Sequence, residues 1–401
     1  MASLPIPSPE AQAQSAQLAT LIRAKIAQAG GWISFAEFMH MALYTPGLGY
    51  YAGGAKKFGQ GGDFVTAPEI SPLFAQTLAR QYAQLEASWV LDCRADVLGF
   101  NILELGAGTG KLAADLLLEL NDLNQLPKQY FILEVSDYLR QIQCETLQKK
   151  LSAELFKRLV WLETLPTTFN GLILGNEVLD AIPVHILHKT QLDNNKVGWR
   201  ERGVGFQMNL DEKFEFIWQD SDLSAPNLAQ HLPETLPENY ITEVCPASSA
   251  LVYSLAETLE AGAILLIDYG FSAREYYHSQ RNLGTLMCHF QHYAHSNPLI
   301  NVGLQDITAH VNFTQIALAC EPISMKIAGY VNQAQFLMNC GILDILAQHS
   351  PDSPQFMQLA AAAQKYLSPA EMGELFKLIA FTKNVELDLI GFKSGDKTHT
   401  L

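Results

Sequence analysis

The stretch that decides the fold is Asn101-Ile-Leu-Glu-Leu-Gly-Ala-Gly-Thr-Gly-Lys111. The apolar run 100–105, which starts one residue before this stretch, predicts a buried parallel strand. The pattern from Lys111 to Leu120 predicts a helix. Between the two lie three alternate glycines, Gly106, Gly108 and Gly110. Glycines at such a turn let the backbone reverse tightly and let a ligand approach the main chain without a Cβ in the way. Strand, glycine turn and helix together indicate the opening of a nucleotide-binding βαβ unit.

Two common phosphate-binding motifs do not fit this loop. A P-loop would have glycine at 105 and Ser or Thr at 112, where this chain has Leu105 and Leu112. A dinucleotide fingerprint would have glycine at 111, where Lys111 stands. The remaining pattern, E-x-G-x-G-x-G, resembles motif I of Rossmann-like S-adenosylmethionine methyltransferases, in which the acidic residue, here Glu104, helps to hold the methionine end of the ligand. The alternative is an ordinary glycine-rich turn of an α/β protein.

The segments that follow predict an α/β, Rossmann-like sheet. Further strands are expected at 130–135, 159–162, 171–175 and 263–267, and a closing β-hairpin at about Phe381–Phe392, whose antiparallel strands suit a methyltransferase sheet. Glu134 lies at the C-terminal end of the expected strand 130–135, 24 residues after Gly110. A carboxylate there can accept hydrogen bonds from both ribose hydroxyls of a nucleoside. The alternative for Glu134 is a solvated carboxylate at a strand end.

Polar residues gather where the strand at 171–175 ends. Asn176, Glu177 and Asp180 come directly after it, and Asp268 follows the strand at 263–267. Ligands of open parallel sheets bind outside the carboxyl ends of the strands, so these four residues are candidates for cofactor binding (Asn176) and catalysis (Glu177, Asp180 and Asp268). The alternative is turn and cap chemistry.

The first 95 residues predict a helical accessory segment. Ser34 and Glu37 match a capping box that starts one helix, and Thr66 and Glu69 match a second one after the glycine-rich stretch from Gly59. A glycine loop at a helix N-terminus suits a small anionic group or a ligand edge, or it is only a connector. The cofactor candidates in this segment are Thr66, Pro68 and Glu69.

The methyltransferase-like domain is expected over 96–401, with insertions at about 185–245 and 271–304. The first insertion is predicted to be a set of hairpins, and the second carries four histidines, at 278, 289, 292 and 295. No Asp or Glu lies among the last three of these, and no metal site is expected. The sequence gives no sign of the oligomeric state.

Composition narrows the class of protein. The chain has 401 residues, 48% of them hydrophobic and 17% charged, which is typical of a globular protein. A net charge of −15 argues against nucleic acid as the main partner. The six cysteines form no C-x-x-C pair, no apolar run is long enough for a membrane span, and the first 19 residues resemble neither a signal nor a transit peptide. We therefore expect a cytoplasmic protein that does not insert into membranes.

Beyond the glycine loop, the chain resembles the MidA family of S-adenosylmethionine-dependent methyltransferases, whose mitochondrial member is a protein arginine methyltransferase needed for respiratory complex I assembly. The resemblance spans nearly the whole chain, and two segments are its most specific: Thr66-Ala-Pro-Glu-Ile-Ser71 and Asn176-Glu-Val-Leu-Asp-Ala-Ile-Pro-Val184. Other matching segments are Gly49-Tyr-Tyr51, Trp199-Arg-Glu-Arg202, Asp268-Tyr-Gly270 and Asp306-Ile-Thr-Ala-His-Val311. The resemblance implies S-adenosylmethionine as the cofactor and a protein substrate, a respiratory complex I subunit.

The chain departs from the family pattern at three positions. Relatives commonly carry Pro and Arg where this loop has Ala107 and Thr109, and we expect these changes to be tolerated because the backbone binds the ligand. Asn312 stands where relatives usually have Asp, and it is therefore left out of the catalytic set.

An arginine acceptor needs carboxylates, because its guanidinium stays protonated and its lone pair is delocalised. Paired carboxylates on the other guanidinium nitrogens fix the nucleophilic nitrogen and stabilise positive charge during transfer. Glu177 is the leading candidate, with Asp180 or Asp268 assisting. Two other functions stay open: a methyltransferase for a small molecule, and a non-catalytic assembly factor that binds a partner.

Overall fold

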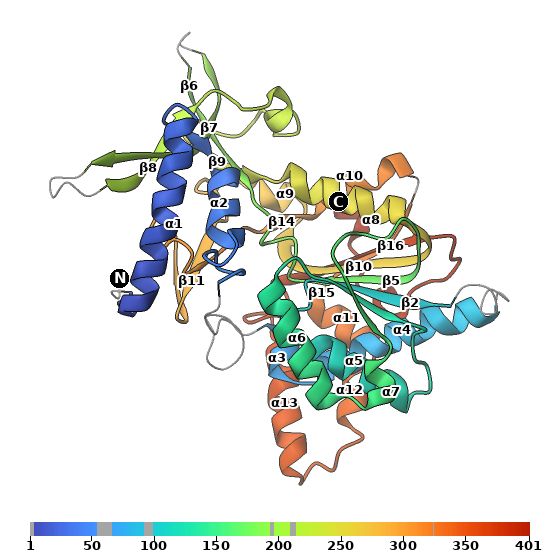
Figure 1. The fold of residues 1–401 in the computed structure, drawn as a ribbon. Helices are drawn as coiled ribbons and strands as arrows, with labels where there is room; N and C mark the ends of the chain where they lie inside the picture. Colours follow the sequence, from blue (N-terminus) through green and yellow to red (C-terminus); the bar gives the residue numbers. More distant parts are fainter. Residues whose placement is uncertain (1–3, 54–65, 92–98, 193–195, 209–213, 324) are drawn as a thin grey trace. The chain divides into compact units, whose positions relative to one another are not determined.

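The computed structural model describes residues 4–53, 66–91, 99–192, 196–208, 214–323 and 325–401 (Figure 1). Contacts divide the chain into two compact units. We call the first the accessory unit; it consists of Met1–Phe64, Asp180–Ser249 and Ala273–His310. The second, which we call the sheet unit, consists of Val65–Leu179, Ala250–Ser272 and Val311–Leu401.

The sheet unit is built on one large, mostly parallel sheet. Its strands follow the spatial order β15-β16-β10-β5-β2-β3-β4, and β14 pairs with β10. The parallel strands are β2 (Asn101–Leu105), β3 (Tyr130–Leu133), β4 (Leu159–Leu162), β5 (Phe169–Asn176) and β10 (Leu259–Phe271). The strand order changes direction between β2 and β5, so the carboxyl ends of these two strands border the crevice in which open sheets bind ligands. The predicted Rossmann-like α/β class is confirmed.

Helices cover both faces of this sheet. Figure 1 shows α8 (Pro246–Thr258) and α10 (Phe313–Ala319) over one face, with α4 (Leu73–Leu91), α5 (Lys111–Asp122) and α11 (Gln333–Asn339) over the other. Burial on both faces explains why β5 and β10 read as nearly continuous apolar runs. The remaining helices of the unit are α3 (Ala67–Ile70), α6 (Asp137–Lys150), α7 (Ala153–Phe156), α12 (Ile342–Leu346) and α13 (Pro354–Leu367).

The end of the chain differs from the predicted closing hairpin at 381–392. The last strand, β16 (Phe376–Lys383), pairs antiparallel with β10 on one side and with the earlier β15 (Lys326–Asn332) on the other. Residues 390–392 form a 3₁₀ turn instead, because Phe392 packs edge-on against Phe336 of α11, with ring centroids 5.5 Å apart. The expectation of antiparallel final strands was right, but the expected partner of β16 was wrong.

The accessory unit surrounds its own core with two helices and two sheets. Helices α1 (Pro9–Gln28) and α2 (Phe35–Tyr44) pack with a five-stranded sheet and a three-stranded sheet. The first sheet consists of β1 (Ile33–Ser34), β6 (His185–Gln191), β7 (Val197–Met208), β8 (Phe214–Ser221) and β9 (Ile241–Val244). The second consists of β11 (Met287–Phe290), β12 (Tyr293–His295) and β13 (Asp306–Thr308), and the short α9 (Ala273–Tyr276) precedes it.

The hairpins expected in the first insertion are therefore present. The predicted cap of α2 also forms, because the Ser34 hydroxyl accepts a 3.2 Å hydrogen bond from the N–H of Glu37. The two units group the chain differently from the predicted segments. Both insertions share one core with α1 and α2, whereas α4 packs on α5 in the sheet unit.

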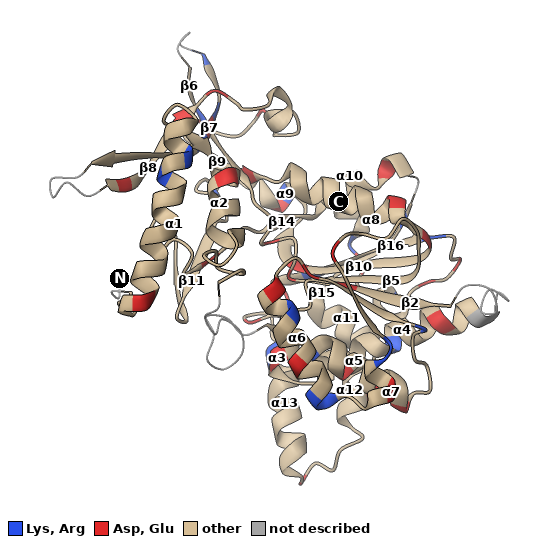
Figure 2. Cartoon of the chain, in the orientation of Figure 1, with Lys and Arg blue, Asp and Glu red and all other residues tan. Residues whose placement is uncertain are grey.

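Two general properties bear on the possible partners. In the described parts of the chain, no helix combines the length and the apolar character needed to cross a bilayer. Figure 2 shows Lys and Arg scattered over the described elements of each unit and gathered into no basic stripe.

Candidate functional site

The glycine loop adopts the conformation that its sequence predicts. Gly106, Gly108 and Gly110 have φ values of 59°, 53° and 81°, in the left-handed region that favours glycine. A Cβ placed on Gly108 would meet no described atom within 4 Å, so the backbone there borders open space. Gly110 is the N-cap of α5. The loop therefore presents bare main chain and a helix N-terminus at the carboxyl end of β2.

Glu104 lies at this end of β2 and is only 3% exposed. Tyr130 of β3 donates a 2.7 Å hydrogen bond from its hydroxyl to Glu104 Oε2. Burial raises the pKa of Glu104 to about 7, the Tyr130 hydrogen bond lowers it, and the nearby Glu134 carboxylate raises it. A carboxyl that is half ionised near neutral pH is well suited to meet a cationic ligand group.

Glu134, one residue beyond β3, is 5% exposed and accepts hydrogen bonds on both oxygens. The N–H of Ser136 donates to Oε1 and Gln143 Nε2 donates to Oε2, each across 2.9 Å. Burial raises the pKa of Glu134, and these hydrogen bonds lower it. Each carboxylate oxygen has a second lone pair, so Glu134 keeps the capacity to accept from ribose hydroxyls.

Gln143 of α6 is a residue of the site that sequence reasoning missed. Its Nε2 also donates to the carbonyl of Gly108 across 3.2 Å, and its Oε1 accepts a 3.1 Å hydrogen bond from Trp161 Nε1. The side chain is completely buried. One amide thus ties the glycine loop to Glu134, two features that the sequence placed 26 residues apart with no visible signal linking them.

Glu69 meets the glycine loop directly. The hydroxyl of Thr109 donates a 2.5 Å hydrogen bond to Glu69 Oε1, so the side chain at position 109 joins the glycine loop to α3, and the tolerance of this position stays a prediction. Thr66 is the N-cap of α3 as predicted, but its side chain makes no capping hydrogen bond, and Pro68 is buried. The predicted glycine-rich stretch before Thr66 lies outside the described residues.

The carboxyl end of β5 carries Asn176 and Glu177. Glu177 has a φ of 52°, a left-handed conformation that is uncommon for a residue with a side chain. Its N–H donates to the carbonyl of Ile267 across 2.9 Å, and its Oε1 accepts a 3.2 Å hydrogen bond from Asn176 Nδ2. Asn176 Oδ1 is buried and accepts no hydrogen bond from a described residue. A buried acceptor without a donor among the described residues is free to accept a hydrogen bond from a ligand.

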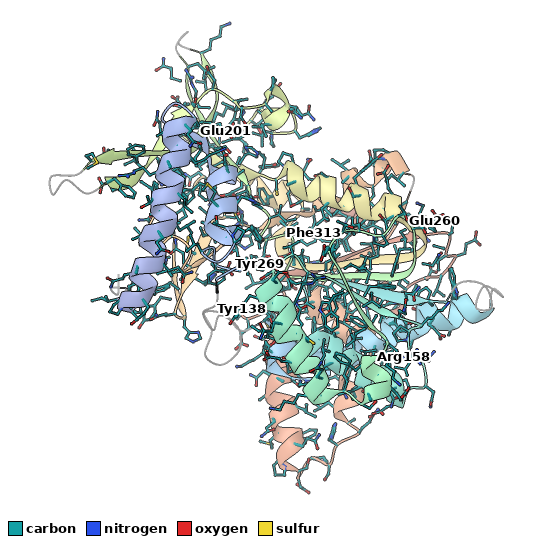
Figure 3. All side chains as sticks on the ribbon, viewed as in Figure 1. Tyr138, Arg158, Glu201, Glu260, Tyr269 and Phe313 are labelled. Atoms are coloured by element: carbon teal, nitrogen blue, oxygen red, sulfur yellow. The ribbon has the colours of Figure 1, made fainter. Side chains whose placement is uncertain are left out.

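Asp268 and Asp180 have different surroundings. Asp268, 1% exposed, accepts from the N–H groups of Leu179 and Tyr269, each across 2.9 Å, and so fastens the chain after β5 to the end of β10, where Figure 3 labels Tyr269. Asp180 belongs to the accessory unit, where its carbonyl accepts from Ala309. The structure thus places Glu177 and Asp268 in the sheet unit and Asp180 in the other, and the catalytic roles of all three stay predictions.

Two further points of the sequence analysis concern Asn312 and possible metal ligands. Asn312 is the N-cap of α10, and its side chain accepts from the N–H of Gln315 across 3.4 Å. Among the described residues, no three His, Cys, Asp or Glu side chains come together as metal ligands.

The residues at the crevice fit a nucleoside with a cationic tail. Open space beside Gly108, acceptors at Glu104 and Glu134, and the unsatisfied Oδ1 of Asn176 together offer bare backbone and hydrogen-bond acceptors around the switch point. Fold and site define a methyltransferase of the Rossmann-like class.

Comparison with known proteins gives the family. The model of the family described as "Putative S-adenosyl-L-methionine-dependent methyltransferase" matches residues 74–331, more than half of the chain. The chain belongs to this family, and it is an S-adenosylmethionine-dependent methyltransferase; the resemblance to MidA proteins is confirmed.

Individual relatives agree over most of the sequence. The mouse and human proteins named "Protein arginine methyltransferase NDUFAF7, mitochondrial" are each 29% identical over 385 residues, which cover 89% of this chain and 82% and 81% of theirs. The Drosophila melanogaster homolog is 29% identical over 411 residues, covering 95% of this chain and 88% of its own. A crystal structure from Burkholderia thailandensis, bound to S-adenosyl-homocysteine, is 46% identical with a TM-score of 0.91, and the match covers all of both chains.

Proposed function

We propose that this methyltransferase transfers the methyl group to an arginine side chain of a protein, and that a subunit of respiratory complex I is its substrate. The observation that carries the arginine assignment is the name of the mammalian relatives, which align with 89% of this chain. The complex I substrate rests on the family resemblance alone.

Glu177 is the residue proposed to meet the acceptor. Its left-handed backbone and its N–H bond to Ile267 fix the carboxylate at the carboxyl end of β5, where the strand borders the crevice. A strained backbone held by its surroundings is common where a side chain must be aimed at a reacting group. A carboxylate at that point would orient a guanidinium and stabilise its charge through paired N–H contacts.

The cofactor is proposed to lie against the glycine loop. Glu134 would accept from the ribose hydroxyls, Glu104 would face the amino group of the methionine end, and Asn176 Oδ1 would accept from the ligand. When bound, S-adenosylmethionine would supply the methyl group: the acceptor nitrogen would form the new bond to carbon, the bond to sulfur would break with its electron pair staying on sulfur, and the proton lost by the nitrogen would pass to solvent. The protein's part is to orient the acceptor and exclude water.

A binding titration followed by a transfer assay tests this proposal. Calorimetry with S-adenosylmethionine should show binding to the wild type and none to the Gly106→Val, Gly108→Val double variant. Incubation with labelled cofactor and an extract of the source cells should place label on arginine in a protein, identified by mass spectrometry. Glu177→Gln should bind the cofactor as the wild type does and lose transfer.

The outcomes separate the rival functions. Label on a small molecule or on a residue other than arginine would replace the arginine proposal. Full activity of Glu177→Gln would remove Glu177 from the mechanism. Cofactor binding without any transfer would favour the non-catalytic assembly factor.

A further inference from the structure

Four chain segments of the accessory unit bring aromatic and acidic side chains together. Tyr44 ends α2, Tyr51 follows in the next turn, Asp180 opens the segment Asp180–Ser249, and Asp306 begins β13. The rings of Tyr44 and Tyr51 lie nearly parallel, with their centroids 5.5 Å apart and an angle of 28° between them. The Tyr44 hydroxyl donates to the carbonyl of Ala181, next to Asp180, across 2.9 Å.

Both carboxylates act on the same phenol. Tyr51 donates a 2.8 Å hydrogen bond from its hydroxyl to Asp306 Oδ1. Burial raises the pKa of Tyr51 well above its usual range, and the charge of Asp306, the neighbouring Tyr44 and the charge of Asp180 raise it further. Tyr51 therefore stays protonated and donates to Asp306.

The backbone fixes these groups relative to one another. The carbonyl of Asp180 accepts a 3.0 Å hydrogen bond from the N–H of Ala309, the residue that follows β13. This bond joins the start of the segment Asp180–Ser249 to the end of the segment Ala273–His310. The backbone of Asp180 is thereby tied to a residue three positions after Asp306.

A second observation indicates a missing ligand. Thr308 lies two residues after Asp306 on β13, so their side chains share one face of the strand. Thr308 is 2% exposed, and its Oγ1 is buried without a hydrogen-bond partner among the described residues. Buried polar atoms are nearly always satisfied, so an unsatisfied hydroxyl beside Asp306 favours a ligand atom as its partner.

We propose that Tyr44, Tyr51, Asp180, Asp306 and Thr308 form a binding site for the guanidinium group of the arginine substrate. The proposal rests on the arginine methyltransferase function given above. It adds four residues of the accessory unit to the predicted Asp180 as candidates for binding the acceptor.

The chemistry of these groups selects a planar cation. Two carboxylates offer acceptors for the N–H groups of a guanidinium, and such charge-assisted contacts are shorter and stronger than neutral ones. The electron-rich faces of tyrosine rings attract a guanidinium, which also stacks on them because it is flat and weakly hydrated. The Thr308 hydroxyl can accept one further N–H. A neutral urea group of the same shape, as in citrulline, would lose the charge-dependent contacts.

Direct titration of the acceptor group tests the site. The probe is N-acetyl-arginine methylamide, which is titrated into protein saturated with S-adenosyl-homocysteine and followed by NMR. The citrulline analogue is titrated in a parallel experiment. The variants are Asp306→Asn and Thr308→Val, which keep side-chain size. Asp222→Asn, which removes a charge from a side chain 92% exposed in the same unit, is the matched control. Calorimetry of S-adenosyl-homocysteine binding and thermal unfolding accompany each variant.

We expect the wild type and Asp222→Asn to bind the arginine probe equally and to bind the citrulline probe at least tenfold more weakly. Asp306→Asn should lower the affinity for the arginine probe at least tenfold, and Thr308→Val should lower it severalfold. The affinity for S-adenosyl-homocysteine should stay unchanged in both variants. Equal binding of the two probes by the wild type, or wild-type affinity in both site variants, would overturn the proposal. If Asp306→Asn does not fold, the affinity of Thr308→Val for the arginine probe tests the proposal by itself.

The same variants distinguish this proposal from the function on which it rests. Transfer of label to arginine by the wild type, with an unchanged KM for Asp306→Asn and Thr308→Val, would refute the site and leave the arginine methyltransferase intact. Absence of arginine labelling, with probe binding that depends on Asp306, would refute the proposed function and leave a guanidinium-binding site.

Discussion

The phenol of Tyr130 donates a 2.7 Å hydrogen bond to the carboxyl group of Glu104, and both side chains are buried in the sheet unit. Without ligand, this bond is the favourable interaction that offsets part of the cost of ionising Glu104 inside the protein. The pair therefore controls the pH at which Glu104, a proposed cofactor contact, ionises. Two of the following predictions depend on it.

The stability of the free protein should fall as Glu104 ionises. Its pKa is about 7 in the folded chain and 4.5 ordinarily, so the unfolded chain loses the proton first as the pH rises. The free energy of unfolding should consequently decline from about pH 4.5 to about pH 7 and stay lower above it, by about 3 kcal/mol at about 1.4 kcal/mol per pKa unit. Urea unfolding across this range should show a decline that Glu104→Gln largely lacks. Parallel pH profiles for the two proteins would contradict the assignment.

Removing the phenol should move this pH range upward. In Tyr130→Phe the carboxylate of Glu104 loses a donor that lowers its pKa, so the decline in stability should extend above pH 7. The same pH series measures it. In the Glu104→Gln background, Tyr130→Phe should leave the pH dependence unchanged; a shift in that double variant would mean that another group titrates.

Gly108→Ala should separate cofactor binding from folding. Gly108 and Gly30 both have left-handed φ values, 53° and 83°, and a Cβ on either would meet no described atom within 4 Å. Each alanine should therefore destabilise the fold by about 1 kcal/mol through its backbone alone. Only the new methyl group at 108 would stand in the space assigned to the cofactor. Calorimetry should show S-adenosyl-homocysteine binding lost or strongly weakened in Gly108→Ala and kept in Gly30→Ala; equal affinities would place the ligand elsewhere.

Gln143→Leu should weaken cofactor binding by about 10- to 100-fold. The substitution leaves Glu134 without a donor to its charged Oε2, an interaction of about 1.5–3 kcal/mol, and frees the carbonyl of Gly108. Gln141→Leu, on the same helix, is the control, because the Gln141 side chain bonds to Glu145 on the exposed surface and to no other side chain in the described parts of the chain. If both variants bind S-adenosyl-homocysteine as tightly as the wild type, Gln143 does not position the site.

Sequence reasoning reached the parts of this protein that depend on local pattern. The apolar run before Gly106 and the freedom of the glycines to adopt left-handed φ values are properties of neighbouring residues. Both predict the loop that the structure shows. The cap at Ser34 is equally local.

The features that could not be predicted from the sequence depend on contacts between distant segments. Gln143 lies in an ordinary polar helical pattern, and only the packing of α6 against the loop brings its amide to Gly108. Thr109 and Glu69 are 40 residues apart, so nothing in their neighbourhoods predicts their hydrogen bond. The predicted hairpin at the end of the chain failed for the same reason, since β16 pairs with strands that end well before it in the sequence.

The place of β16 has a consequence for how the protein is made. This strand occupies residues 376–383, yet in the sheet it lies between β10 and β15. During synthesis the sheet stays incomplete until β16 has left the ribosome, and β10 and β15 keep unpaired edges until then. A stop codon shortly before Lys377 would therefore remove an internal strand and leave two open edges. Loss of β16 should therefore give an aggregating product.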